Sequence, residues 1–336
     1  MNLPEVAPWI AAQSQALLAQ SGHAWLLVGP SGLGQYRLGL ALVSAWLCER
    51  PTEQGACAAC GSCHAIEVRT HADLCVLMPE TVSLELGWPL SEKAQGEIDA
   101  KARKPSKEIR IDAMRDAIEF SQRTSARGRG KAVLVFPAER MNHVTANALL
   151  KTLEEPPGDV KFVLASDAAH QLLPTIRSRC LAHTMLWPAT DASLAWLQQQ
   201  GLDARQAAVM LRASGGRPHD ALQLSQGGPG GPTPASWVKL PQAMARGDVA
   251  GFKDWTPTQA VNALQKLCHD LLAIKVGASP RFFDAADLPS VSSLASLTAW
   301  AKALATVVRT VEHPFNSGLM LEALVSQAQN ALNAKN

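Results

Sequence analysis

The chain has 336 residues and a formal charge of +2, from 31 Lys and Arg against 29 Asp and Glu. At about 100–200 residues per domain, this length predicts two or three domains. A hydrophobic fraction of 47% can fill ordinary cores, which excludes wholesale disorder. The near-balanced charge excludes a protein surface that is strongly basic throughout, so any contact with nucleic acid is expected to be local or shared with partners.

The longest apolar run, residues 38–48, is about half as long as the ~20 residues that a membrane-spanning helix needs. The N-terminal sequence MNLPEVAPWI has no basic region followed by an apolar stretch, so we expect no secretory signal. We therefore expect a cytoplasmic protein without membrane contact. Its seven cysteines are then reduced thiols or metal ligands.

The first 190 residues alternate short apolar runs with helical patterns, which is typical of an α/β domain with a parallel sheet. Buried strands are expected at residues 24–29, 72–79, 131–137 and 160–166. Helices are expected at residues 38–48, at 113–122 with Asp112 as N-cap, and at 145–155 before a double proline.

Residues 81–107 form a charged, glycine-containing stretch without periodicity, and we expect a mobile insertion there. Its basic residues could contact DNA phosphates, although a solvated loop is the stronger interpretation. These residues are Lys101, Arg103, Lys104 and Lys107.

After residue 190 the sequence predicts helices alone. Short helices are expected at residues 192–200, 204–213 and 218–226, and long ones at 261–276, 294–312 and 319–332. The Gly/Pro run at 227–234 cannot continue a helix and is the best domain boundary in the chain. We therefore predict three domains, at residues 1–167, 168–226 and 235–336.

The segment GPSGLGQYRLG follows a strand and opens a helix, which is the context of a phosphate-binding P-loop. The working motif needs lysine and Ser/Thr, where this chain has glutamine and tyrosine. The strand at 131–137 ends without Asp, and Glu139 lies beyond its proline. These three losses predict a degenerate loop without functional ATP binding, and an ordinary strand–helix turn is the alternative. The loop residues concerned are Gly29, Gly32, Gly34, Gln35 and Tyr36.

Four cysteines follow the spacing C-x8-C-x2-C-x2-C, namely Cys48, Cys57, Cys60 and Cys63. The two short steps place thiolates on a tight knuckle, and the upstream cysteine can complete a tetrahedron. This pattern predicts a structural Zn²⁺ site. His64 could replace one thiolate, and a redox pair is the other alternative. The remaining cysteines are expected to be small buried hydrophobes.

Two further segments are distinctive. ANALLKTLEEPP, residues 146–157, reads as an amphipathic helix with an acidic end and a double-proline stop. LLPTIRSRC, residues 172–180, places Arg177 and Arg179 two positions apart beside a proline-started turn. This turn is either a solvated basic turn or the carrier of an arginine directed at another molecule's phosphate.

Taken together, these segments resemble the clamp-loader branch of the AAA+ proteins. The resemblance is dense from about residue 20 to 190, and beyond it HPFNSGLMLEALV, residues 313–325, is similar to the family's closing helix. It implies an AAA+ P-loop-type domain at 1–167 with a zinc module at 48–63. A small helical lid at 168–226 and a helical collar at 235–336 would follow.

The resemblance also implies a function. The chain would be a non-hydrolysing subunit of the clamp loader of a bacterial DNA polymerase III holoenzyme, which loads the sliding clamp on primer–template DNA. Its partners would be gamma/tau and delta subunits, and Arg179 would act as an arginine finger in trans at the ATP site of the adjacent gamma/tau subunit. Zn²⁺ would be bound by the four cysteines, and the isolated chain would have no catalytic activity.

One departure from the family concerns the residues that sense ATP. His219 stands at the likeliest position of the family's second sensor arginine, with Arg217 two residues earlier, and Ser166 lies near the first sensor position. Both features argue against nucleotide sensing by this chain. The alternatives are a self-sufficient AAA+ ATPase and a zinc-dependent nucleic-acid-binding protein.

Overall fold

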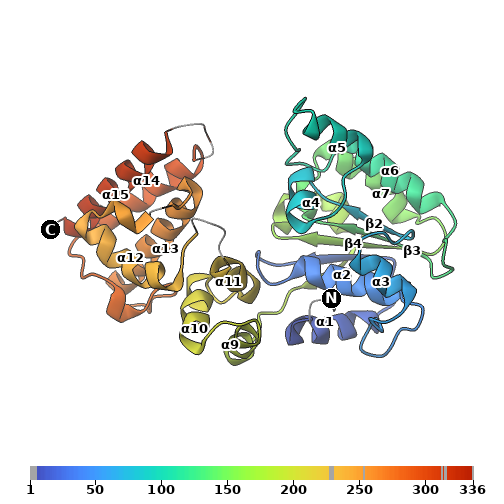
Figure 1. Ribbon diagram of the computed structural model, residues 1–336, viewed down its shortest axis with the longest axis horizontal. Helices are drawn as coiled ribbons and strands as arrows, with labels where there is room; N and C mark the ends of the chain where they lie inside the picture. Colours follow the sequence, from blue (N-terminus) through green and yellow to red (C-terminus); the bar gives the residue numbers. More distant parts are fainter. Residues whose placement is uncertain (1–5, 227–230, 253, 312, 314–315, 335–336) are drawn as a thin grey trace. The chain divides into compact units, whose positions relative to one another are not determined.

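The computed structural model of the chain describes residues 6–226, 231–252, 254–311, 313 and 316–334. It divides into two compact units, Met1–Trp187 and Pro188–Asn336. The first unit is an α/β layer structure and the second is helical (Figure 1). Within the Gly/Pro run expected at 227–234, residues 227–230 lie outside the described residues.

The first unit is built on a five-stranded parallel sheet with the order β2-β3-β4-β1-β5. The four strands expected from apolar runs are present, and a fifth strand follows the TIRSRC segment. This fifth strand, with the sequence LAHT, is largely exposed and therefore has no apolar run to predict it. The strands are β1 Ala24–Val28, β2 Leu74–Leu77, β3 Lys131–Val135, β4 Val160–Ser166 and β5 Leu181–Thr184.

Helices cover both faces of this sheet. Figure 1 shows α1, α2 and α3 on one side of it and α6 and α7 on the other. Short 3-10 turns lie at Ala138–Arg140 and Ala169–Gln171. The helices are α1 Pro8–Leu18, α2 Gln35–Leu47, α3 Gly61–Glu67, α4 Glu80–Leu86, α5 Glu92–Asp99, α6 Ile111–Gln122, α7 His143–Glu154 and α8 Pro174–Arg177.

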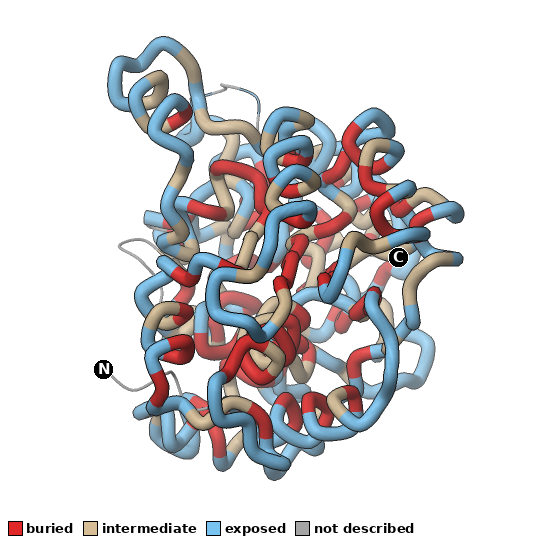
Figure 2. The backbone as a smooth tube through the Cα atoms, turned by 90° about the vertical axis from the view of Figure 1, so that its right-hand side faces the viewer, coloured by how far each residue is buried: buried red, intermediate tan, exposed pale blue. Residues whose placement is uncertain are grey.

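Strand β3 shows how the two faces are filled, because successive side chains of a strand point to opposite sides. Val133 and Val135 belong to the core that contains side chains of α6 and α7. Leu134 faces α2, where a Cβ on Gly39 would lie 2.7 Å from its Cδ1 atom. Glycine at this position therefore allows α2 to approach the sheet closely. Figure 2 shows the buried stretches gathered inside and the exposed turns outside.

The segment expected to be an irregular insertion is ordered by charge, which corrects the sequence-based expectation. It forms α4 and α5, and the buried carboxylate of Glu80, the first residue of α4, bonds to the loop after α5. Arg103 donates to both Glu80 oxygens, at 2.5 and 2.8 Å, and through Nε to Glu97 at 2.6 Å. Arg103 is thus bonded within the chain. Its partner Glu80 lies 23 residues earlier, so no helical or strand periodicity relates the two positions.

A second correction concerns the start of α6. Asp112 was expected to be the N-cap, but the helix begins at Ile111 with Arg110 in the N-cap position. Asp112 lies instead in the first turn, where a negative charge interacts favourably with the helix dipole. An acidic residue is favourable both at the N-cap and in the first turn, so the sequence alone does not decide between these two positions for Asp112.

The second unit consists of helices in the part of it that the structure describes. It confirms the six expected helices and adds α12, which starts at a Thr233 capping box. Within the described ranges, none of the helices of the chain combines the length and hydrophobicity that a bilayer crossing requires. The helices are α9 Thr190–Gln199, α10 Ala204–Ala213, α11 Pro218–Ser225, α12 Pro234–Arg246, α13 Pro257–Lys275, α14 Leu294–Val308 and α15 Ser317–Asn333.

A buried carboxylate organises the second unit. Asp270 of α13 is 0% exposed and accepts backbone hydrogen bonds from Arg281, Phe282 and Phe283, at 2.9, 2.7 and 2.8 Å. These bonds fix the loop after α13, whose Phe283 ring stacks on Trp237 of α12. One carboxylate therefore connects two helices through a loop.

We predict that Asp270→Ala lowers the free energy of unfolding of this unit by about 3 kcal/mol, because it leaves three backbone N–H groups without their acceptor. Urea denaturation followed by circular dichroism measures the change. Asp191→Ala, at an exposed position in the first turn of α9, is the control and is expected to stay within about 0.5 kcal/mol. An equally small effect of Asp270→Ala would contradict the prediction.

Candidate functional site

The first candidate site is the loop between β1 and α2. Gly32 and Gly34 have φ angles of +80° and +98°, which glycine adopts without strain, and Gly34 is the N-cap of α2. Gly29 lies at the end of β1, where its N–H donates to the Ser166 carbonyl of β4 at 3.4 Å. The loop therefore has the strand–turn–helix form of a phosphate cradle.

The side chain at the lysine position of the motif turns back into the loop. Gln35 is 2% exposed, and its Nε2 donates to the carbonyls of Gly29 and Pro30, at 2.7 and 2.8 Å. An amide nitrogen has two N–H groups, and both are used here. The Nε2 group of Gln35 is thus committed to its own backbone and has no further N–H for a phosphate.

The next position is also occupied by contacts within the chain. The Tyr36 hydroxyl accepts a hydrogen bond of 2.6 Å from Trp88 Nε1, and the Tyr36 ring packs against Phe136 with centroids 5.4 Å apart. Burial raises the pKa of Tyr36 above its usual value, so the phenol is neutral at physiological pH. Trp88 belongs to the segment that the sequence left without a role, and Arg69 lies over its ring.

The carboxylate after β3 is bonded to the end of β4. Glu139 accepts from the Ser166 hydroxyl at 2.7 Å and from the Asp167 N–H at 3.2 Å. Ser166 itself is fully buried. The lysine, hydroxyl and carboxylate positions of the site are therefore all engaged by groups of this chain.

The residue considered for the second sensor lies in the other unit. Arg217 Nε pairs with the Asp220 carboxylate at 2.8 Å, and the His219 ring lies 5.1 Å from that of Trp196, centroid to centroid. Burial raises the pKa of Asp220, and the nearby Arg217 opposes this shift. Both sensor candidates therefore have partners within their own unit.

The second candidate site is the arginine pair at the end of α8, with Arg177 as the last helical residue and Arg179 beyond it. Arg179 Nε donates to Glu154 Oε1 at 2.6 Å, Nη2 donates to the same oxygen, and Nη1 donates to the Thr175 carbonyl at 2.8 Å. Its side chain is 30% exposed. Arg177 is exposed and forms no ion pair in the described part of the chain. Arg179 is therefore held in one orientation by hydrogen bonds, whereas Arg177 is exposed to solvent.

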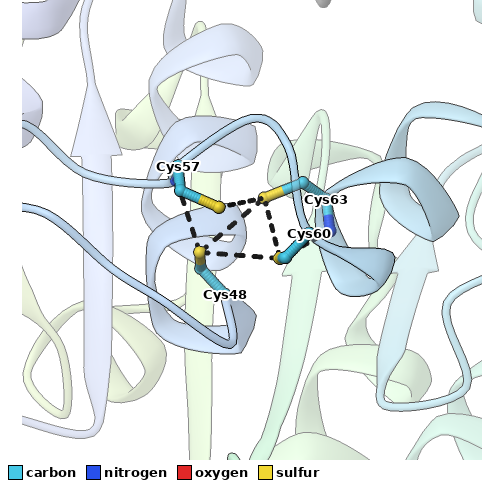
Figure 3. A group of neighbouring side chains, drawn as sticks. All are labelled: Cys48, Cys57, Cys60 and Cys63. Atoms are coloured by element: carbon cyan, nitrogen blue, oxygen red, sulfur yellow. Dashed lines mark hydrogen bonds between the residues drawn. The ribbon is translucent and has the colours of Figure 1, made fainter.

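The third candidate site is the cysteine cluster, shown in Figure 3. The four sulfurs lie within 4.8 Å of one another, and the hydrogen-bonded pairs are 3.4–4.0 Å apart. A tetrahedral ion with metal–sulfur bonds of about 2.3 Å needs sulfurs about 3.8 Å apart. The cluster can therefore hold a metal ion. His64 lies outside it, exposed and 3.8 Å from Glu67.

The local chain explains how this knuckle forms. Cys48 is the C-cap of α2, and Cys60 is the N-cap of α3, whose Cys63 N–H donates to the Cys60 sulfur at 3.4 Å. Burial opposes ionisation of Cys60, but hydrogen bonds from Cys63, Glu49 and Cys57 together outweigh it and lower its pKa to about 6. Burial raises the pKa of Cys63 to about 12, with Cys60 and Cys48 adding to the shift. A cation would be needed to ionise all four thiols together.

A carboxylate that sequence reasoning missed fastens the knuckle to the rest of the unit. Glu49 Oε1 accepts from the Ser62 N–H and hydroxyl, at 3.0 and 3.2 Å, and from Arg127 Nη1 at 2.8 Å. The Arg127 N–H in turn donates to Asp73, whose carboxylate is paired with Lys131 at the start of β3. The position of Glu49 directly after Cys48 was the signal available in the sequence.

Comparison with known proteins places the chain. A family model described as DNA polymerase III, delta subunit, matches residues 10–186. The DNA polymerase III subunit delta' of Pseudomonas aeruginosa is 38% identical over 226 residues, which cover 66% of this chain and 62% of that protein. The DNA polymerase III subunit delta' of Escherichia coli is 33% identical over 226 residues, which cover 66% of this chain and 61% of that protein. The matched region thus spans about three fifths of these relatives.

Two further relatives extend the comparison. The DNA polymerase III subunit tau of Salmonella typhimurium is 29% identical over 267 residues, covering 77% of this chain and 34% of that protein. A solved gamma subunit-related protein of Thermotoga maritima has a TM-score of 0.51 at 17% identity, with 96% of this chain and 99% of that chain covered. The latter likeness concerns the fold alone.

The fold and the loop define a parallel-sheet α/β protein with a glycine loop between β1 and α2, and the side chains of Gln35 and Tyr36 beside this loop are bonded to the protein itself. The chain belongs to the DNA polymerase III delta subunit family, and the relatives with the highest identities reported above are its delta' members.

Proposed function

We propose that this chain is a delta'-type subunit of a bacterial DNA polymerase III clamp loader. In this role it assembles with gamma/tau and delta subunits and helps to place the sliding clamp on primer–template DNA, as a non-hydrolysing component of the DNA-directed DNA polymerase holoenzyme. Its family membership and the names of its relatives support the proposal. The lid predicted at 168–226 would be formed by α9, α10 and α11, since α8 and β5 belong to the first unit, and the helices of 235–336 would form the collar.

The observation that carries the non-hydrolysing role is the engagement of all three nucleotide-site positions. Gln35 fills the loop, Tyr36 is bonded to Trp88, and Glu139 is bonded to Ser166. A working site needs a cationic side chain on the phosphates, and a short hydroxyl and a carboxylate for Mg²⁺. The alternative of a self-sufficient AAA+ ATPase would require these three groups to be replaced from elsewhere.

We predict that the purified chain does not bind labelled ATP with Mg²⁺ at concentrations up to the millimolar range in equilibrium dialysis. Gln35→Lys is expected to restore no turnover, because Tyr36 and the engaged Glu139 remain. A hydrolysing gamma/tau subunit serves as the positive control. Micromolar binding by the native chain, or phosphate release by Gln35→Lys, would contradict the proposal and favour an ATPase or ATP sensor.

We also propose that Arg179 acts in trans on the ATP of the adjacent gamma/tau subunit. The guanidinium is partly exposed, and Arg179 lies on the short turn between α8 and β5. Arginine provides planar, bidentate hydrogen bonding to phosphate, and its charge is permanent. An arginine in this role stabilises the charge that develops in phosphoryl transfer.

We predict that Arg179→Ala leaves the chain folded and able to assemble with gamma/tau and delta subunits. Hydrolysis at the one ATP site that Arg179 serves should fall about 10³-fold or more. The total turnover of the complex then falls by the fraction that this site contributes. Steady-state phosphate release by the reconstituted complex measures the loss. Arg177→Ala is the matched control, and equal turnover of the two variants would show that Arg179 has no role in trans.

We further propose that the four cysteines bind one structural Zn²⁺. The donor set of four sulfurs at tetrahedral spacing supports zinc, which takes four thiolates in closed sites. When bound, the ion would neutralise thiolate charge and cross-link the end of α2 to α3. A zinc-dependent nucleic-acid-binding protein would use the same ligands, but two carboxylates lie beside the cluster, the exposed Glu49, paired with Arg127, and the part-buried Glu67.

We predict one equivalent of zinc per chain by atomic emission, and less than about a tenth of it in the double variant Cys60→Ser/Cys63→Ser. Removal of the ion should destabilise the first unit, because metal-binding free energy contributes to folding. Cys75→Ala, at a half-buried position outside the cluster, is the control and should keep its zinc. Full zinc content in the double variant would overturn the assignment, and loss of DNA binding without loss of fold would favour the alternative.

A further inference from the structure

The positions of Glu154 and Arg179 are set by the same hydrophobic core. Glu154 is the last residue of α7, and the preceding Leu153 is buried in the core that α6 and α7 form with the sheet. Ile176 of α8 lies in that core as well, three residues before Arg179. The two backbones are therefore fixed relative to each other, and the ion pair between the side chains does not depend on a mobile loop.

The contacts of the guanidinium leave one of its edges open. Of its five N–H groups, the one on Nε and one on Nη2 point to Glu154 Oε1, and one on Nη1 points to the Thr175 carbonyl. A further contact from Nη1 to Ser178 Oγ, at 3.5 Å, is at the limit of a hydrogen bond. The second N–H group of Nη2, and that of Nη1 once the long contact to Ser178 is released, are thus available to another molecule.

We propose that Glu154 is a positioning residue for Arg179. It holds the guanidinium by its Nε side, so that the two terminal nitrogens face outward together and can donate in parallel to two phosphate oxygens. This inference rests on the proposed action of Arg179 in trans, and it adds the residue that aims the arginine. Thr175 contributes the second fixed point through its carbonyl.

Orientation is the physical benefit of this arrangement. A long arginine side chain with no fixed partner samples many rotamers and must lose that freedom when it meets a phosphate. Arg179 has already lost it in the isolated chain, whereas Arg177 has no ion pair in the described residues. Groups held close to their productive geometry raise rates strongly, and a displacement of about 1 Å can cost about 100-fold.

The Glu154 carboxylate also has an effect that opposes positioning: its negative charge weakens the attraction of Arg179 for phosphate. The two effects predict changes of opposite sign when Glu154 is removed. If positioning dominates, turnover falls, and if competition dominates, turnover rises. The Glu154 side chain is 47% exposed, so the loss of this ion pair on substitution of Glu154 should leave the fold intact.

The test uses the reconstituted complex with gamma/tau and delta subunits and the variants Glu154→Ala, Glu154→Gln and Glu155→Ala. We expect Glu154→Ala to lower kcat at the affected ATP site between about 10- and 100-fold, with an unchanged KM for ATP because the contact acts in the transition state. Glu154→Gln keeps an oxygen acceptor and should recover most of the activity. Glu155→Ala, at the adjacent exposed position, should match the native complex.

The double variant Arg179→Ala/Glu154→Ala separates the two proposals. If Glu154 acts through Arg179, the double variant is no slower than Arg179→Ala alone. A further loss, or a native or raised kcat of Glu154→Ala while Arg179→Ala is slow, would overturn the positioning role and leave the arginine finger standing. A native rate for Arg179→Ala would instead overturn the proposed action in trans, on which the inference depends.

Discussion

The close approach of α2 to the sheet is the constraint on which the first unit depends. Gly39 permits it, because any larger residue would meet Leu134 of β3 and Val163 of β4. Both ends of this helix carry a candidate site: its N-terminus opens at the glycine loop, and its C-terminus leads into Cys48. The packing of one helix therefore places the nucleotide-like loop and the first thiol of the metal cluster at the same time.

The nucleotide-like loop keeps its backbone form while its side chains bond within the chain. Gln35, Tyr36 and Glu139 contact the loop itself, the segment after α4 and the end of β4, respectively. Each replaces an interaction that a phosphate or Mg²⁺ would make in a working site. In the proposed function, the α/β frame presents Arg179, which follows α8, to the neighbouring subunit.

Features encoded in adjacent residues could be predicted from the sequence, and features made by distant side chains could not. Four strands followed from apolar runs, and the thiols of Cys48–Cys63 follow from short spacing. The exposed strand β5 lacked an apolar run. The contacts Tyr36–Trp88 and Arg179–Glu154 join residues 52 and 25 positions apart, and no local pattern reports such pairs.

The hydrogen bonds around Glu49 have a mechanical consequence. Ser62 in the cysteine knuckle, Glu49, Arg127, Asp73 and Lys131 form a continuous series of polar contacts that ends at the first residue of β3. Force or displacement at the knuckle is therefore transmitted to the sheet through charged groups as well as through the backbone. Substitutions of Glu49 and Arg127 are expected to be coupled through their side chains, whereas the link from residue 127 to Asp73 uses a backbone N–H that a substitution at 127 retains.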